Sequence, residues 1–587
     1  MRIPFKWEIR PTGGACDFGP ELERQLPPLV RQLLAQRGVA GRAEAEKYLR
    51  PRLADLGDPF ALKEMDLAVA RIFRALDVGE RICVYGDYDV DGVSSVTLLM
   101  AVLEAYGAVP RYFIPIRTRE GYGLSEAGLR RCMEEGEKPG LLITVDCGTS
   151  SVEEIETLGR EGVDVIVLDH HEAGPHGRPG AVAVVNAKME EESPLTYLCS
   201  AGVVFKLAHA LLKTRRLDHF DLRNFLDIVA IATVADIVPL VDENRLLTRH
   251  GLRLLGEGRN PGLKALNEVT NAPPAPGSSH VSFRIGPRIN AAGRMDAPLD
   301  AVALLRAGDL PRARELARRL DDYNRLRQSK EEKIRSEAIA MLKRDFSPER
   351  DHVIVLGSRA WHPGIVGIVA SYLMRLYHKP TFIVSLDANG LGKGSGRSVE
   401  GVSLVQALQA CSEHIVSGGG HDMAAGLVIR EEKIDDFRRS FERYVAGRGG
   451  RADRRPVLHI DAEVGLPELT LDLLDSYELL EPFGNNNPQP VFMARNVNLS
   501  DAPRRLQGNH LRLFLRQGVA ECDAIYFNGA DVALPDPPWD IAFTIDRNVW
   551  RGRSSLSISI QDIRSATECT TDDVTTDFTD WNTDSHR

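Results

Sequence analysis

Aspartates and histidines recur at four places in the chain, in a pattern that suits metal-dependent hydrolysis. The segment 84–92 reads Val-Tyr-Gly-Asp-Tyr-Asp-Val-Asp-Gly, and it is followed by Thr-Val-Asp-Cys-Gly at 144–148, Asp-His-His at 169–171 and Ala-Asp-Ile-Val-Pro at 235–239. Each set follows or interrupts an apolar run of the kind that forms a buried strand or helix. Because charges at the ends of buried elements must be paired or bound to a metal, the pattern predicts a hydrolytic metal centre.

A single aspartate after a strand has a simpler explanation, which is that it caps the following helix. That explanation is the better one for Asp91 or Asp146 taken alone. It does not extend to three clusters at three successive strand ends, one of them with adjacent histidines. Asp236 lies inside the apolar run 228–238, where an unpaired carboxylate is costly. It therefore needs a partner, either an arginine or a metal, and the other candidate ligands favour the metal.

The elements that would position these residues alternate between strands and helices. The apolar pattern predicts strands at 82–85, 141–145 and 163–168, and helices at 92–106 and 151–162. Buried strands joined by helical crossovers form a parallel sheet with helices on its faces. Ligands gather at the carboxyl ends of such strands, and the first three acidic clusters follow these strands directly.

The chain has 587 residues and is therefore too long for one core. Its composition, with 43% hydrophobic and 27% charged residues, is typical of soluble globular proteins. The predicted fold class is α/β and multi-domain. The expected parts are an N-terminal helical lead-in (1–75), a parallel-sheet domain (76–308), a charged connecting helix (309–345), a smaller α/β domain (346–447), a small β-barrel (456–565) and a disordered acidic tail (566–587).

The net charge of −10 neither supports nor excludes a polyanionic substrate. Half of it lies in residues 566–587, which hold six acids and one base. A bound divalent cation would also reverse the field at an acidic site.

Eight cysteines occur singly, with no C-x-x-C pair, which indicates buried thiols in a reducing compartment rather than zinc ligands or disulfides. No apolar stretch reaches the roughly 18 to 20 residues of a membrane span, so we expect a cytoplasmic protein and no membrane partner.

The acidic clusters occur together with five further motifs. On this whole set the chain resembles the DHH phosphoesterase superfamily and, within it, the single-stranded-DNA-specific exonucleases. These motifs are Gly-Pro-Arg-Ile-Asn-Ala-Ala-Gly-Arg at 286–294, Trp-His-Pro-Gly at 361–364, Ser-Gly-Arg-Ser at 395–398, Gly-Gly-Gly-His at 418–421 and Glu-Pro-Phe-Gly at 481–484. Asp-His-His alone is a weak signal, but the ordered set covers nearly the whole chain. The resemblance implies a DHH catalytic domain, a DHHA1-like substrate-binding domain and an OB-like nucleic-acid-binding barrel.

The resemblance also implies a centre of two Mn²⁺ or Mg²⁺ ions. Its ligands carry over to Asp89, Asp91, Asp146, His170 and Asp236. Oxygen-rich coordination with one imidazole suits Mn²⁺ and differs from a closed structural zinc site. The catalytic residues Asp87, Asp169 and His171 are then expected to orient the ligands or donate protons.

Paired ions can activate a bridging water and hold a phosphate for in-line attack, and cationic donors stabilise the charge that develops. The candidates for substrate binding are Arg117, Arg288, Asn290, Arg294, His362, Arg397, Ser398, Gly419, Gly420 and His421. An isolated arginine is more often a solvated surface charge, but most of the four arginines in this list lie among glycines, prolines and short turns. The glycine-rich segment at 418–420 either cradles a phosphate through its amides or forms a tight turn.

The favoured function is a single-stranded-DNA exonuclease, with the barrel feeding the strand by stacking and backbone contacts. The resemblance implies 5′ to 3′ polarity, release of 5′-mononucleotides and work in DNA repair and recombination, as a monomer beside single-strand-binding protein and a helicase. The same centre could hydrolyse short oligonucleotides, cyclic dinucleotides or pyrophosphate, but such relatives generally lack the barrel. The alternative is a non-catalytic DNA-binding scaffold that retains the fold. Such a protein is expected to have lost metal ligands, whereas all five are present here.

The chain departs from the family pattern in two places. Asn486 stands where a second glycine usually follows Pro-Phe-Gly, and asparagine tolerates left-handed backbone, so we expect the turn to survive. The acidic tail is the other departure, and the sequence assigns it no role.

Overall fold

The computed structural model describes residues 5–566, apart from residues 15, 175, 191, 349, 448–455 and 551. The chain folds into two units. The larger comprises Leu53–Gly450 with Pro482–Asn487, and the smaller comprises Met1–Arg52, Arg451–Glu481 and Pro488–Arg587. Most of the flexible join predicted at 446–451, and the acidic tail except residue 566, lie outside the described residues.

A five-stranded sheet forms the first part of the larger unit. Its order is β3–β2–β4–β5–β6 and every pair is parallel, as the sequence predicts. The strands are β2 (Ile82–Gly86), β3 (Arg111–Phe113), β4 (Leu141–Val145), β5 (Asp164–Leu168) and β6 (Ala183–Val185). The central β2 and β4 are buried along their whole length, which explains their continuous apolar sequences.

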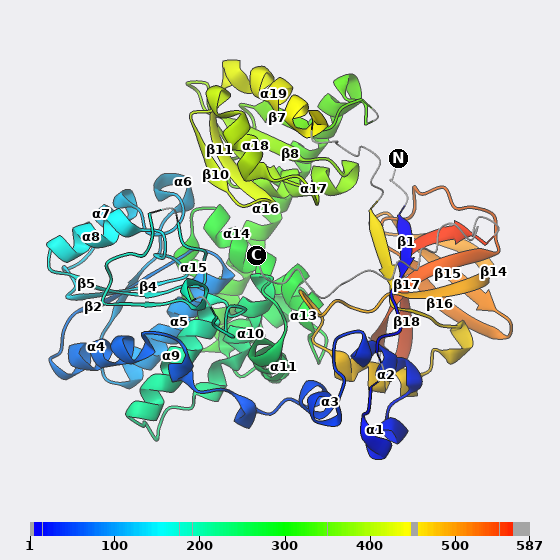
Figure 1. Cartoon of the computed structure of the whole chain (residues 1–587), viewed down its shortest axis with the longest axis horizontal. Coiled ribbons are helices and arrows are strands. Elements are labelled where there is room, and N and C mark those ends of the chain that lie inside the picture. The colour runs from blue at the N-terminus through cyan, green and yellow to red at the C-terminus, as the bar shows by residue number, and fades with distance from the viewer. Residues whose placement is uncertain are drawn as a thin grey trace. The chain divides into compact units, whose positions relative to one another are not determined.

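Helices cover both faces of this sheet (Figure 1). Successive side chains of a strand point to opposite faces, so the sheet contributes to two separate apolar cores. The larger core contains α4 (Met65–Asp77), α5 (Val90–Ala105), α9 (Ser200–Thr214) and α10 (Leu226–Ala235), and the smaller contains α7 (Glu126–Glu134) and α8 (Val152–Arg160). The helices predicted at 92–106 and 151–162 are thus confirmed as α5 and α8.

The rest of this part is helical. It comprises α6 (Arg117–Glu120), α11 (Asp242–Glu257), α12 (Pro261–Thr270), α13 (Ser278–His280), a π-helix (Val281–Ile285), α14 (Gly286–Arg294) and α15 (Pro298–Leu305). Within the described ranges, no helix is both long and apolar enough to cross a membrane.

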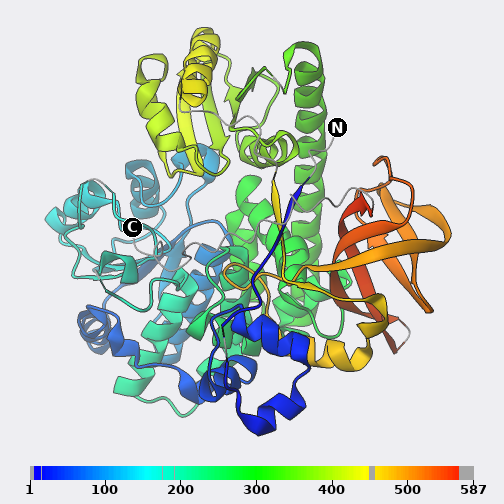
Figure 2. The same cartoon turned by 45° about the vertical axis from the view of Figure 1, so that its right-hand side comes forward.

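The predicted connecting helix is α16 (Leu310–Asp345), a single helix of 36 residues that Figure 2 shows unbroken in green. Asp309 caps it by accepting a hydrogen bond from the Arg312 amide, and a proline follows at the first turn. Its sparse apolar residues are buried in two cores: Leu316 and Leu320 pack with the parallel-sheet part, and Ile334 packs with the second α/β part.

The second α/β part has a mixed sheet of order β10–β11–β9–β8–β7, in which only β7 and β8 run parallel. Its strands are β7 (Ile354–Ser358), β8 (Thr381–Leu386), β9 (Leu391–Arg397), β10 (Ser417–Gly420) and β11 (Ala424–Arg430). Its helices are α17 (Val366–Tyr377), α18 (Leu404–Ala410) and α19 (Ile434–Gly447). The segment 418–420, expected either to cradle a phosphate or to form a tight turn, is part of the edge strand β10.

The smaller unit contains the predicted barrel. Its strands are β14 (Phe492–Leu506), β15 (His510–Gln517), β16 (Ala520–Tyr526), β17 (Trp539–Trp550) and β18 (Arg553–Ser565). Pairing of β14 with β17 closes the five strands, and the short β13 (Ala462–Glu463) adds to β14. Closure leaves no free edge among these strands.

The N-terminal segment belongs to this smaller unit rather than to a lead-in ending at residue 75. Its helices are α1 (Gly19–Gln25), α2 (Pro28–Ala35) and α3 (Arg42–Leu49). The sequence analysis missed β1 (Lys6–Ile9), which pairs in parallel with β12 (Val457–Ile460). A run of four residues carries too little periodicity to show a strand whose partner lies about 450 residues away.

Candidate metal centre and substrate cavity

The turn between β2 and α5 brings three aspartates close together. Asp89 caps α5, because its Oδ1 accepts hydrogen bonds from the amides of Asp91 (2.9 Å) and Gly92 (3.1 Å). The capping role considered for Asp91 therefore falls to Asp89. A Cβ at Gly92 would lie 2.4 Å from the carbonyl oxygen of Asp87, so only glycine permits this tight turn. Both carboxylate oxygens of Asp87 are buried without a hydrogen-bond partner.

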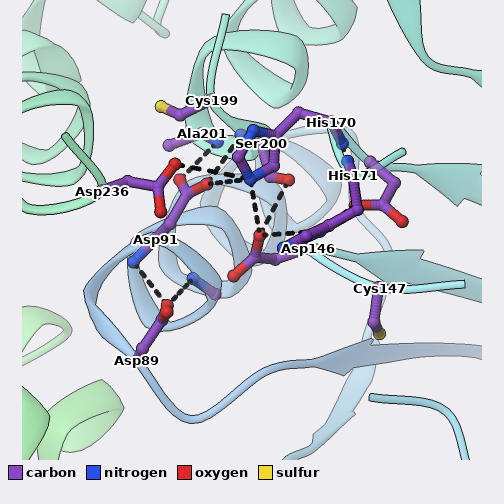
Figure 3. Close-up of polar contacts among 12 residues, drawn as sticks. Asp89, Asp91, Asp146, Cys147, His170, His171, Cys199, Ser200, Ala201 and Asp236 are labelled. Atoms are coloured by element: carbon purple, nitrogen blue, oxygen red, sulfur yellow. Dashed lines mark hydrogen bonds and ion pairs between the residues drawn. The ribbon is translucent and has the colours of Figure 1, made fainter. Parts of the chain in front are cut away.

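The imidazole of His170 faces three carboxylates from different parts of the chain (Figure 3). Its Nε2 lies 3.4 Å from Asp236 Oδ2, 3.5 Å from Asp146 Oδ1 and 3.8 Å from Asp91 Oδ2. Neither ring nitrogen has a hydrogen-bond partner among the described residues, although both are buried. Unpartnered nitrogen and oxygen atoms that converge in this way can coordinate a cation.

Three groups of side chains place their potential ligand atoms within 4.8 Å of one another. They are Asp91–His170–Asp236, Asp87–Asp89–Asp146 and Asp146–His170–His171. All five ligands expected from the resemblance fall within these groups. Asp87, which the sequence analysis placed in a supporting role, lies in the second group, and Asp146 belongs to two of them.

The start of α9 holds two of these carboxylates in place. Asp91 accepts hydrogen bonds from the amides of Ser200 (2.7 Å) and Ala201 (2.8 Å), where the helix N-terminus favours negative charge. The Ser200 hydroxyl donates to Asp146 Oδ1 at 3.0 Å. Ser200 could not be predicted from the sequence, because a serine at a helix start is ordinary and nothing local links it to residues 91 and 146.

Asp169 does not face the cation groups but orients its neighbour. Its Oδ1 lies 2.8 Å from His171 Nδ1 and also accepts from the amide of His170. The other ring nitrogen of His171, Nε2, lies 2.8 Å from the Tyr122 hydroxyl. Asp169, His171 and Tyr122 thus form a chain of hydrogen bonds beside the centre. Tyr122 is a second residue that the sequence analysis missed.

The electrostatics of the centre favour binding of a cation. Burial, reinforced by the neighbouring carboxylates, raises the pKa of Asp236 to about 8 and that of Asp91 to about 6. The same causes raise the pKa of Asp146 well above its ordinary value. Burial lowers the pKa of His170 to about 3, so its ring is neutral and able to donate a lone pair. Divalent ions would relieve the repulsion among these carboxylates.

The Asp169–His171 pair behaves differently. Burial disfavours a charged His171, but the hydrogen bond and negative charge of Asp169 outweigh it and raise the pKa of His171 to about 9. Although burial acts in the opposite direction on Asp169, its contacts with His171 lower the pKa of that carboxyl well below its ordinary value. The pair therefore holds a proton close to the carboxylates.

A cavity of about 390 Å³ brings together three of the predicted substrate residues. Arg117, Arg397 and Gly420 line it, together with Lys393 and Tyr122, which the sequence analysis did not single out. Burial, then the charge of Arg117, lowers the pKa of Arg397. A cavity with three cationic side chains at its wall suits a phosphate group.

Arg294 and Asn290 lie next to this region. Asn290 Oδ1 accepts a hydrogen bond from the Val90 amide (3.1 Å), which braces the start of α5. Arg294 donates to the carbonyl oxygen of Gly364 (2.8 Å). Both residues line a second cavity.

The other predicted substrate residues are not at these cavities. Arg288 forms an ion pair with Asp321 (2.8 Å), and the buried Ser398 hydroxyl donates to the Val402 carbonyl (2.6 Å). His362 Nδ1 accepts from the Gly364 amide (3.1 Å). Gly419 and His421 are exposed at the end of β10. These positions show bracing contacts or open surface, and their role in substrate binding stays a prediction.

Three family models match separate segments of the chain. The DHH family, N-terminal domain, matches residues 81–233, the DHHA1 domain matches 350–447, and the RecJ OB domain matches 460–562. The second and third segments correspond to the mixed sheet and the barrel.

Known proteins are similar over nearly the whole chain. The single-stranded-DNA-specific exonuclease RecJ of Bacillus subtilis is 35% identical over 95% of this chain and 70% of its own length. That of Dickeya dadantii is 34% identical over 96% of this chain and 99% of its own. The crystal structure of RecJ in complex with Mn²⁺ from Thermus thermophilus matches with a TM-score of 0.80 and 30% identity, over 96% of this chain and 80% of that one. On these grounds the chain belongs to the RecJ family.

Proposed function

We propose that this protein is a metal-dependent exonuclease specific for single-stranded DNA. The observation that carries the proposal is the convergence of Asp91, Asp146 and Asp236 on the unpartnered imidazole of His170. The curated relatives are named as single-stranded-DNA-specific exonucleases, and RecJ structures from Thermus thermophilus contain Mn²⁺ or Mg²⁺. A scaffold that had lost its chemistry would have no reason to keep five unneutralised aspartates and an imidazole together.

The candidate ligands fit two ions of Mn²⁺ or Mg²⁺. Asp91, His170 and Asp236 would hold one, and Asp87, Asp89 and Asp146 the other. Carboxylate-rich sites with one imidazole suit these metals. The bound ions would supply an activated water and neutralise charge at the scissile phosphate.

The protein's own side chains then position the strand and move protons. Arg117, Lys393 and Arg397 would bind the terminal phosphate in the cavity of about 390 Å³, which favours attack at a strand end over attack within the strand. His171, oriented by Asp169, carries a proton that can pass through Nε2 and the Tyr122 hydroxyl toward the departing oxygen. Attack from the 5′ end and release of 5′-mononucleotides are part of the proposal and rest on the family resemblance.

We also propose a cytoplasmic role in DNA repair and recombination, in which the monomer works beside a single-strand-binding protein and a helicase. The cysteines of the described residues are free and mostly buried, as in proteins of reducing compartments. The match of the barrel to an OB domain supports binding of unpaired strands, because OB-folds stack bases and follow the backbone.

Digestion of end-labelled DNA tests the function. Wild-type protein with Mn²⁺ or Mg²⁺ should shorten single strands from the 5′ end and leave duplexes intact. Asp146→Ala should abolish cutting and leave DNA binding largely unchanged. Asp322→Ala removes an exposed carboxylate of α16 and should cut like wild type, so it is the matched control. Binding without cutting by wild type in either metal would instead support the scaffold interpretation.

A further inference from the structure

Two thiols and a guanidinium meet in the smaller apolar core of the parallel-sheet part. Cys83 lies in β2 and Cys132 in α7, and both side chains are fully buried. Their Sγ atoms lie 3.8 Å apart. Arg111 of β3 stands beside Cys83 in the register of the sheet, and its Nη1 donates to the sulfur of Cys132 at 3.6 Å. These three side chains form one cluster, and the chemistry proposed for the metal centre uses none of them.

Arg111 has no carboxylate partner in this cluster. Among the residues that the structure describes, it takes part in no ion pair, and its Nη2 is buried without a hydrogen-bond partner. Arg71, a buried arginine of the same unit, is by contrast paired with both Glu80 and Asp164. The positive charge beside Cys132 is therefore not neutralised, and such a charge favours the thiolate form of a neighbouring cysteine.

The two thiols of the cluster differ in acidity. The contact with Cys83, followed by the charge of Arg111, lowers the pKa of the Cys132 thiol, although burial acts in the opposite direction. The contact with Cys132, followed by burial, raises the pKa of the Cys83 thiol well above its ordinary value. Burial also raises the pKa of Cys147 and of Cys199 well above that value. Cys132 is thus the sulfur suited to react, and Cys83 is a second thiol in contact with it.

We propose that Cys83 and Cys132 form a redox-sensitive pair that closes to a disulfide when the protein meets a peroxide. The Cys132 thiolate attacks one oxygen of hydrogen peroxide, the O–O bond breaks, and the departing hydroxide takes up the proton that Cys132 has lost. This step gives a sulfenic acid and one water. The sulfur of Cys83 then attacks the sulfenic sulfur, the S–O bond breaks, and the hydroxyl leaves with the proton of Cys83 as a second water. Two thiols are oxidised to one disulfide, and the peroxide is reduced to two waters.

Access to the buried pair depends on local opening of α7. This helix has nine residues, of which only Gly128, Leu129 and Cys132 are buried. An element with few buried side chains opens at a lower free energy than a strand that is buried along its whole length, such as β2. The same opening would admit a small reducing thiol, which reopens the disulfide by exchange.

Closure of the pair would reach the substrate cavity through α7. A disulfide bond is about 2.0 Å long, so the two sulfurs must approach each other by about 1.8 Å, and α7 can move more easily than the buried β2. Arg131, which precedes Cys132, forms an ion pair with Glu120 at 2.7 Å, and Glu120 ends the short helix α6 that begins at Arg117. Movement of α7 would therefore displace Arg117 from the wall of the cavity of about 390 Å³. This effect on activity rests on the proposed exonuclease function, whereas formation of the disulfide does not.

Peptide mapping of the full-length protein under non-reducing conditions tests the proposal. The protein is treated with hydrogen peroxide, catalase removes the excess, free thiols are alkylated, and fragmentation mass spectrometry locates each linkage. A linkage between Cys83 and Cys132 should form and should disappear after treatment with dithiothreitol. In parallel, kcat/KM on 5′-phosphorylated single strands with Mn²⁺ should fall about ten-fold on oxidation, as expected for a displaced substrate contact, and should recover on reduction.

Variants separate the roles of the three side chains. Cys132→Ala should abolish both the linkage and the response of activity to peroxide. In Cys83→Ala the sulfenic acid has no resolving thiol, so dimedone should label Cys132. Arg111→Met should slow formation of the linkage about ten-fold, and Arg111→Lys, which keeps the charge, should slow it less. Cys411→Ala removes a buried cysteine of the second α/β part and should respond to peroxide like wild type, so it is the matched control.

Wild-type protein that shows no linkage between Cys83 and Cys132 after peroxide treatment would overturn the proposal. A linkage that leaves kcat/KM unchanged, or a Cys132→Ala protein that loses as much activity as wild type, would overturn the control of activity by the pair. If the untreated protein cuts no single strand, the proposed exonuclease function fails, and the mapping still decides whether the disulfide forms.

Discussion

The hydroxyl of Ser200 donates a hydrogen bond to Asp146 Oδ1 across 3.0 Å, although 54 residues separate the two in the sequence. The amide of the same serine donates to Asp91, so the first turn of α9 fixes two candidate ligands relative to each other. Contacts of this kind set the angles at which carboxylates meet a metal. Positioning of the ligands therefore depends on a residue that does not itself reach the centre.

Removal of this hydroxyl should weaken metal binding. Ser200→Ala leaves an oxygen of Asp146 free to rotate, and we expect the affinity for Mn²⁺ to fall about 10-fold to 100-fold. Isothermal titration of the metal-free protein with Mn²⁺ measures this directly. Ser200→Thr keeps the hydroxyl and should restore most of the affinity. Equal affinities in wild type and Ser200→Ala would show that the hydrogen bond has no part in binding.

Loss of the Tyr122 hydroxyl should affect turnover more than binding. Tyr122→Phe keeps the ring against His171 but removes the 2.8 Å contact with Nε2. We expect kcat on single-stranded DNA to fall by about one to two orders of magnitude with little change in KM, because proton transfer and not affinity is impaired. Steady-state kinetics with a 5′-labelled oligonucleotide provide the measurement. A change confined to KM would assign Tyr122 to substrate binding.

Asp227 should make stability depend on pH. This carboxyl is buried in α10, and burial raises its pKa to about 7, above the value of about 3.9 in an unfolded chain. The folded state therefore binds the proton more tightly, so the contribution of Asp227 to stability is greatest below pH 4 and is lost as the pH rises through 7. Asp227→Asn lacks this loss, which amounts to about 4 kcal/mol over the whole pH range.

Thermal unfolding of both proteins between pH 5 and pH 8 measures the effect. The melting temperature of Asp227→Asn minus that of wild type should become more positive as the pH rises. A difference that is constant across this range would show that Asp227 has an ordinary pKa in the folded protein.

Ile237→Asn should stabilise the protein and impair its activity. The φ of Ile237 is 60°, a left-handed value that strains a β-branched residue. Asparagine adopts this conformation more readily, and relief of the strain is worth about 1 kcal/mol. The substitution also removes an apolar side chain from the lining of the second cavity, the one that Asn290 and Arg294 also line. We expect a higher melting temperature together with a lower kcat/KM on single-stranded DNA. Val109→Asn replaces a β-branched residue that is 98% exposed and has no left-handed φ, so it should show neither effect.

The positions of the first three acidic clusters could be predicted from sequence, because each of them directly follows an apolar strand. Parallel strands end at the same edge of a sheet, so Asp87, Asp146 and Asp169 had to lie near one another. The turn at Asn486 was also predictable, since its φ is 56° and asparagine accepts that conformation. In both cases a local pattern determines the geometry.

Contacts between distant segments could not be predicted in this way. Ser200 and Tyr122 are ordinary residues in ordinary surroundings, and their positions beside the site result from packing of segments far apart in sequence. Arg288 shows the converse case: its motif suggests substrate binding, and the sequence gives no sign of its ion pair with Asp321 of α16. Motifs identify residue types, whereas the neighbours of each residue decide which charges remain available.

The pairing of β1 with β12 has a consequence for synthesis of the chain. Residues 6–9 leave the ribosome first, yet their partners at 457–460 follow some 450 residues later. At about 5 to 20 residues per second, this amounts to tens of seconds or more. Residues 53–447, which form most of the larger unit, can fold during that interval, while the N-terminal segment stays without its β-strand partner. Nascent chains halted before residue 457 should therefore protect the metal-centre region from proteases and leave residues 5–14 open to cleavage.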